Sequence, residues 1–112
     1  SKPIPHKETM VDDTLPLVKL TKMGTISDMK TIALEWEPIK DRRVRGVYIY
    51  KSELSSEGKG SSGYYHTINS RSGTHYVDND VKPETSYSYY FITYSKKARS
   101  LPSKETIVST LP

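Results

Sequence analysis

Residues 81–93 read VKPETSYSYYFIT, and this stretch decides the fold. An apolar residue, a proline and a threonine lead into Tyr87, which opens a strand of alternating aromatic residues. This is the pattern of the tyrosine corner, in which a tyrosine hydroxyl bonds to the backbone a few residues upstream and ties together the two sheets of a β-sandwich. The stretch therefore predicts an architecture and points to no reaction.

Short runs of alternating apolar residues recur on both sides of this stretch, separated by turn residues, which is typical of strands. We expect strands at residues 17–23, 31–36, 44–51, 64–68, 74–77, 86–95 and 106–110. Gly24 is expected to end the first of them, and the Ser-, Gly- and Glu-rich residues 52–63 to form a flexible loop. No helical period persists, so the pattern predicts an all-β, immunoglobulin-like sandwich of seven strands.

Composition limits the class of protein further. A chain of 112 residues has room for one domain with an ordinary core. It has no cysteine, which excludes disulfides and thiolate chemistry, and no apolar run long enough for a membrane-spanning helix. The net charge of +4 and a pI near 9.2 permit an acidic partner. Residues 1–14 are expected to form an extended arm or linker before a domain of residues 15–112.

Several motifs in a fixed order resemble the fibronectin type III family. They are Ile32-x-Leu34-x-Trp36, the run RGVYIYKS at residues 45–52, the corner at 81–91, and the ending at 100–112. One departure is Val47, where many members carry an aromatic residue. The resemblance implies sheets of strands A-B-E and C-D-F-G, Trp36 as the central core aromatic, Tyr87 as the corner tyrosine, and no catalytic site or cofactor.

The basic, tyrosine-rich composition and the arm resemble more closely the fibronectin-like surface lipoproteins of campylobacter-type bacteria. Those proteins are tandem type III arrays on the outer membrane that act as adhesins for host fibronectin. The resemblance implies the first module of such an array, with neighbouring type III modules, a role in virulence, and membrane contact only through a lipid outside this chain. It implies a host matrix protein such as fibronectin as partner, and no nucleic acid.

Candidate metal ligands are few. The histidines have no ligand spacing; they are His6, His66 and His75. Asp78, Asp80 and Glu84 surround the corner turn and could gather a cation, but hydrogen bonds of Asx turns are the expected role. We expect no metal site and no enzyme.

The expected topology places the loops after the second, fourth and sixth strands at one end. These loops carry most of the candidate binding cations, which are Lys40, Arg42, Arg43, Arg45, Arg71, Lys96, Lys97 and Arg99. Asp41 alone opposes them there, while the opposite end is mostly acidic. Such a basic end suits a sulfated glycan, an acidic protein segment or an anionic headgroup. The alternative is a set of solvated loops, or electrostatic contact with a neighbouring module.

Alternation along the strands also turns four tyrosines outward. They are Tyr48, Tyr50, Tyr90 and Tyr94, which could form an exposed aromatic stripe at an interface. Plain cross-strand packing is the alternative. A further route to binding is addition of an extended peptide at the edge of the strand at 64–68.

Function divides into three hypotheses. The leading one is a non-enzymatic adhesion module at a bacterial cell surface that contributes to binding host matrix. The alternatives are a structural spacer without a ligand of its own, and an accessory module of a secreted glycosidase. The single tryptophan argues mildly against the last.

Overall fold

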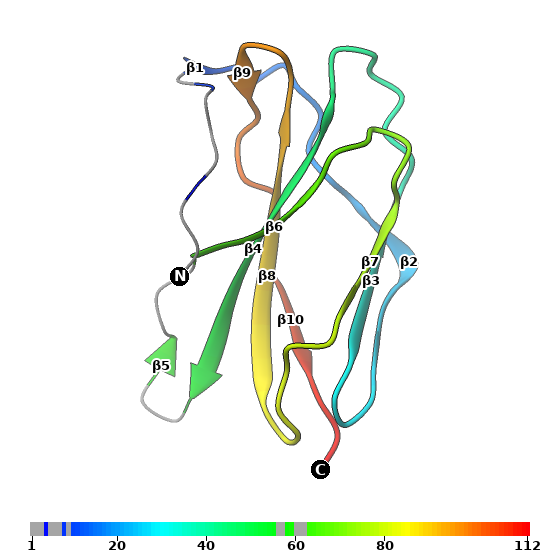
Figure 1. Cartoon of the computed structure of the whole chain (residues 1–112), viewed down its shortest axis with the longest axis vertical. Coiled ribbons are helices and arrows are strands. Elements are labelled where there is room, and N and C mark those ends of the chain that lie inside the picture. Colours follow the sequence, from blue (N-terminus) through cyan, green and yellow to red (C-terminus); the bar gives the residue numbers. More distant parts are fainter. Residues whose placement is uncertain (1–3, 5–7, 9, 56–57, 60–62) are drawn as a thin grey trace.

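The computed structural model describes residues 4, 8, 10–55, 58–59 and 63–112 (Figure 1). These residues form two sheets and no helix, so none of them belongs to a helix that could cross a membrane. The smaller sheet has the order β2-β3-β7, formed by β2 (Leu20–Ser27), β3 (Ile32–Trp36) and β7 (His75–Asp78).

In the larger sheet, β4 pairs with both β6 and β8, and β8 pairs with β10. These four strands are β4 (Gly46–Ser55), β6 (Gly63–Ile68), β8 (Ser86–Tyr94) and β10 (Thr106–Ser109). Three two-residue strands that the sequence did not predict lie at its margins: β1 (Met10–Val11), β5 (Gly58–Lys59) and β9 (Ala98–Arg99). The division into A-B-E and C-D-F-G sheets is confirmed.

The core lies between the sheets, where alternating residues of both are buried. Trp36 is buried, and its ring centre lies 5.3 Å from that of Phe91 across the sandwich. Its indole nitrogen donates a hydrogen bond to the carbonyl of Gly73 at 3.1 Å. Val47 and Ile49 close the same core from β4. The prediction of Trp36 as the central core aromatic is therefore confirmed.

The tyrosine corner is present. The hydroxyl of Tyr87, at the start of β8, accepts a hydrogen bond of 2.7 Å from the backbone N–H of Lys82, five residues upstream. Thr110, just after β10, braces the same turn: its hydroxyl donates to the carbonyl of Lys82 and accepts from the N–H of Thr85. The turn is thus fastened both to β8 and to the last strand.

The expected end of the first strand at Gly24 is wrong. β2 continues through Gly24 to Ser27, and its pairing with β3 shifts register between Leu20 and Thr25, as in a β-bulge. A Cβ atom at Gly24 would lie 2.7 Å from Cβ of Leu20 and 2.8 Å from the carbonyl of Thr21. Glycine is needed there for close approach of the backbone within a strand, and not to end it.

The expected loop at residues 52–63 is also partly wrong. β4 runs on to Ser55 and stays paired with β8, with Ser52 opposite Ser88 and Leu54 opposite Ser86. Residues 58–59 then return as β5 along β4. Residues 56–57 and 60–62 of that expected loop lie outside the described residues.

The loops divide between the two ends of the sandwich (Figure 1). The β3–β4, β6–β7 and β8–β9 connections lie at one end, at the top of the picture, where β1 also lies beside β9. The β2–β3 and β7–β8 turns and the last residue lie at the other end. We call the first of these the basic end, because it carries the predicted cationic loops.

Candidate binding surfaces

Five of the eight predicted cations at the basic end are exposed and form no ion pair within the described part of the chain. They are Lys40, Arg42, Arg45, Lys96 and Lys97. Arg71 reaches across from the β6–β7 loop, with its guanidinium 3.4 Å from the carbonyl of Lys40, so two of the loops meet here. The end therefore presents several free positive charges.

Arg43 differs from its neighbours because its guanidinium is fully engaged. It donates hydrogen bonds to both carboxylate oxygens of Asp41, the shortest of them 2.6 Å long, and lies 3.5 Å from the carboxylate of Asp12. It also donates to the hydroxyl and the carbonyl of Thr14, at 2.9 and 3.0 Å. Hydrogen bonds from Arg43 lower the pKa of Asp41 to about 2, and the bond to Asp41 raises the pKa of Arg43. Arg43 holds the arm in place, and its guanidinium is occupied while the arm is docked.

Arg99 has a similar role. Its guanidinium donates to the carbonyl of Glu8 at 2.7 Å, and its own carbonyl accepts from the N–H of Asp12 at 2.9 Å. The prediction did not foresee that two of its eight cations bind the chain's own N-terminal arm. The signal was present as the acidic residues of the arm, Glu8 and Asp12, which a linker does not need.

The predicted exposed tyrosine stripe is not exposed. Tyr48 and Tyr50 do face outward from the larger sheet, but they are only 4% and 6% accessible. Tyr94 stacks on Tyr48 with ring centres 4.4 Å apart, and Tyr90 stacks on Tyr50 at 4.7 Å. Tyr64 of β6 meets both inner rings edge-on, at 6.0 and 6.2 Å. Cross-strand packing, the alternative interpretation, describes this tyrosine cluster.

Gly46 makes room for that packing. It lies opposite Tyr94 in the β4–β8 ladder, and a Cβ atom there would lie 2.5 Å from the Tyr94 hydroxyl and collide with the carbonyl of Ile68. The ring of Tyr94 packs over the backbone of Gly46, and in this position it stacks on Tyr48.

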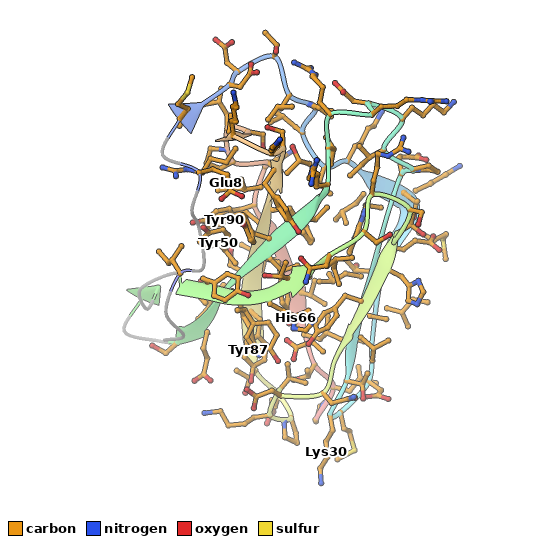
Figure 2. All side chains as sticks on the ribbon, turned by 45° about the horizontal axis from the view of Figure 1, so that its top comes forward. Glu8, Lys30, Tyr50, His66, Tyr87 and Tyr90 are labelled. Atoms are coloured by element: carbon orange, nitrogen blue, oxygen red, sulfur yellow. The ribbon has the colours of Figure 1, made fainter. Side chains whose placement is uncertain are left out.

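Glu8 of the arm lies beside the tyrosine cluster (Figure 2). Glu8, Tyr90 and Tyr50 lie along the same side of the molecule in this view. The Tyr48 hydroxyl lies 3.2 Å from each carboxylate oxygen of Glu8. Burial, together with the Glu8 charge, raises the pKa of Tyr48, and burial raises the pKa of Tyr50 to about 12. A groove of about 460 Å³ remains beside the arm, lined by Ile4, Val11, Tyr50, Tyr90, Ile92, Arg99, Ser100, Leu101 and Pro102.

A polar cluster is buried between the two sheets around Asp78, and the sequence did not predict that Lys51 is its cation. The Lys51 ammonium lies 2.9 Å from Oδ2 of Asp78, whose side chain is fully buried. The Tyr89 and Tyr65 hydroxyls donate to the two Asp78 oxygens at 2.6 and 2.7 Å. Lys51 also donates to the carbonyl of Asp80 and lies over the Tyr65 ring.

The predicted Asx turn at Asp78 is confirmed, because the N–H of Asp80 donates to its Oδ1 at 2.9 Å. Burial alone would raise the pKa of Asp78, but hydrogen bonds from Tyr89, Lys51 and Tyr65 hold it below its usual value. Burial and the bond to Asp78 raise the pKa of Tyr89. The cation beside Asp78 is thus the chain's own lysine, and the described residues contain no cluster of metal ligands.

One apolar surface was not predicted at all. Ile26, Ala33 and Val77 lie in one row across β2, β3 and β7, and Ile26 and Val77 are exposed on the outer face of the smaller sheet. Met23 and His75 line the same shallow groove of about 300 Å³. Alternation in β2 and β7 would have indicated it, had β2 been expected to pass Gly24.

Two sheets in this order, joined by a tyrosine corner, define the fibronectin type III β-sandwich, and the chain has this fold. No family model matches the sequence, and no curated protein does. The solved third fibronectin type III domain of human KIAA0343 superposes with a TM-score of 0.65 at 16% identity, covering 99% of this chain and 92% of that one.

Two other solved structures have the same fold. A Fn3-like protein from Clostridium thermocellum gives a TM-score of 0.57 at 23% identity, covering 86% of this chain and 88% of that one. A chicken CNTN1 fragment of domains FN1–FN3 gives 0.65 at 16% identity over 85% of this chain. The chain spans only 29% of that fragment, because the fragment contains three such domains. At these identities the likeness concerns the fold.

Proposed function

We propose that this chain is a non-catalytic adhesion module that binds an acidic partner through its basic end. The observation that carries the proposal is a group of exposed cations on two loops of one end, none of them in an ion pair with a described residue: Lys40, Arg42, Arg45, Lys96 and Lys97. Opposite charge on a partner would be attracted to such an end, and arginine forks suit carboxylates and sulfates.

The setting we propose is the surface of a bacterial cell, in a tandem array anchored by a lipid outside this chain. Its partner would be host fibronectin, as the resemblance to campylobacter-type surface lipoproteins implies. Tandem arrangement of the same fold occurs in the CNTN1 fragment, which supports an array without identifying a ligand.

The test is binding of the folded chain to immobilised fibronectin and to immobilised heparin at physiological salt. We expect saturable binding that weakens at least tenfold in the triple variant Lys40→Ala, Arg42→Ala, Arg45→Ala. The matched control is Lys30→Ala, Lys82→Ala, Lys104→Ala, which removes an equal number of positive charges, all of them outside the basic end (Lys30 is labelled in Figure 2). Both variants change the net charge from +4 to +1, that is 4 − 3.

No saturable binding to either surface would overturn the proposal and would favour the spacer function. Equal weakening in both triple variants would show that net charge acts without a localised site.

A further inference from the structure

Glu8 and residues 10–14 of the N-terminal arm contact the sandwich as a bound peptide contacts its receptor. β1 pairs in parallel with β9, with Met10 opposite Ala98 and Val11 opposite Arg99. The backbone N–H of Asp12 extends this pairing with a bond of 2.9 Å to the carbonyl of Arg99. Strand addition of this kind is a general mode of peptide recognition. Strand addition was predicted at the edge of β6. In the structure a strand is added at β9 instead, and that strand is β1 of the chain's own arm.

Side chains of the sandwich recognise particular groups of the arm. Arg99 binds the carbonyl of Glu8, and the Tyr48 hydroxyl lies within bonding distance of its carboxylate. Four residues further on, Arg43 lies 3.5 Å from the carboxylate of Asp12. Two carboxylates four positions apart therefore meet a tyrosine and an arginine fixed on the domain.

Between these polar contacts the arm meets an apolar groove. Ile4 and Val11 line it from the arm, Tyr50, Tyr90 and Ile92 from the sheet, and Leu101 and Pro102 from the chain after β9. The groove keeps about 460 Å³ of space with the arm in place. The groove can therefore accept an apolar side chain at the position of Val11, including one larger than valine.

The hold on the arm is nevertheless limited. The ladder is two residues long, and Met10 and Val11 remain 62% and 50% accessible. A segment with so little buried apolar surface opens at a small cost in free energy. Its advantage over an outside peptide is that it is tethered, which corresponds to a local concentration on the order of millimolar.

We propose that β9 and the groove, together with Arg43, Arg99 and Tyr48, form a docking site for an acidic extended peptide. The peptide runs parallel to β9 and carries a carboxylate, an apolar residue three positions later and a second carboxylate four positions later. The arm is the built-in occupant, and a partner segment of this chemistry displaces it. This site is separate from the exposed cations of the proposed function, so either can fail without the other.

The test uses the full chain with an arm that no longer docks, Glu8→Ala, Val11→Gly, Asp12→Ala. The probe is a fluorescein-labelled peptide with the wild-type sequence of residues 4–14, followed by fluorescence anisotropy. We expect saturable binding to this variant, at least tenfold tighter than to the wild-type chain, whose own arm competes. Adding Arg99→Ala to the variant should weaken binding at least tenfold, and a control peptide with Glu8→Lys and Asp12→Lys should not bind.

Absence of binding to the arm variant, equal binding of the control peptide, or no effect of Arg99→Ala would each overturn the proposal. Fluorescence of Trp36 and a thermal unfolding curve establish that the arm variant is folded. Should it not fold, hydrogen exchange of the wild-type chain decides: millimolar unlabelled peptide should speed exchange of the Asp12 amide, and an unchanged rate contradicts displacement.

Discussion

At the scale of single residues, Tyr87 and Trp36 take the places that local motifs predicted, because each motif fixes its own turn or strand. Lys51 and Asp78 could not be predicted as a pair. They come from β4 and β7, which belong to different sheets, and their contact depends on how the sheets stack. Periodicity assigns a residue to a face, but it does not say which residue lies opposite across the core.

Replacement of Tyr87 by phenylalanine removes the acceptor of the Lys82 N–H while keeping the ring. We expect a loss of about 1 kcal/mol or more in the free energy of unfolding, measured with urea, since a part-buried donor is left unpaired. Tyr94→Phe is the control, because its hydroxyl bonds an exposed partner, Asn69, and should cost less. Equal stability of Tyr87→Phe and the wild type would contradict the corner's role.

The lowered pKa of Asp78 predicts a dependence of stability on acid. A carboxyl whose folded pKa lies below its unfolded value, about 3.9, stabilises the fold above that value and stops doing so as the pH falls through the folded pKa. At neutral pH, Asp78→Asn should cost about 3–5 kcal/mol, because the mostly buried Lys51 ammonium loses its anion. The difference from wild type should shrink below about pH 4. Unfolding curves from pH 7 to 2 measure it, and a constant difference would argue against an ionised Asp78.

At the scale of elements, the strands were predicted well where apolar alternation was uninterrupted, as in β3 and β8. Errors fell at strand ends. Gly24 was interpreted as a stop although it allows a bulge, and the serines after β4 were interpreted as loop although β8 continues to pair with them. In both places the partner strand determines the structure, and local composition does not report the partner.

Gly46 tests whether the tyrosine cluster depends on close packing over β4. Gly46→Ala places a Cβ against the Tyr94 ring and a backbone carbonyl, so we expect a loss of about 1–3 kcal/mol in unfolding free energy. Gly73→Ala is the control, since its added Cβ closely approaches only one side-chain methyl, Cγ2 of Ile68, and no backbone atom. The unfolding free energies of both variants are measured by calorimetry or with urea. Equal losses would show that the Tyr94 ring can move aside at little cost.

At the scale of the whole molecule, the topology brings the loops that carry the predicted cations to one end. The expectation that Asp41 alone opposes them is wrong, because the carboxylate of Asp12 also lies there, 3.5 Å from Arg43. The arm is where the prediction was incomplete. Its docking depends on Arg43 and Arg99, which a view based on charge alone assigned to a ligand. A short segment with little apolar periodicity reveals its contacts only when the surface that receives it is known.

The salt dependence of binding tests the central claim, a localised basic site, most directly. The measurement is the affinity of the chain for immobilised fibronectin over a series of salt concentrations, because screening weakens attraction between exposed charges. We predict a steep loss of affinity with salt for the wild type and for the Lys30, Lys82, Lys104 control. The Lys40, Arg42, Arg45 variant should show a clearly shallower dependence. The same slope in all three proteins would contradict binding through the basic end.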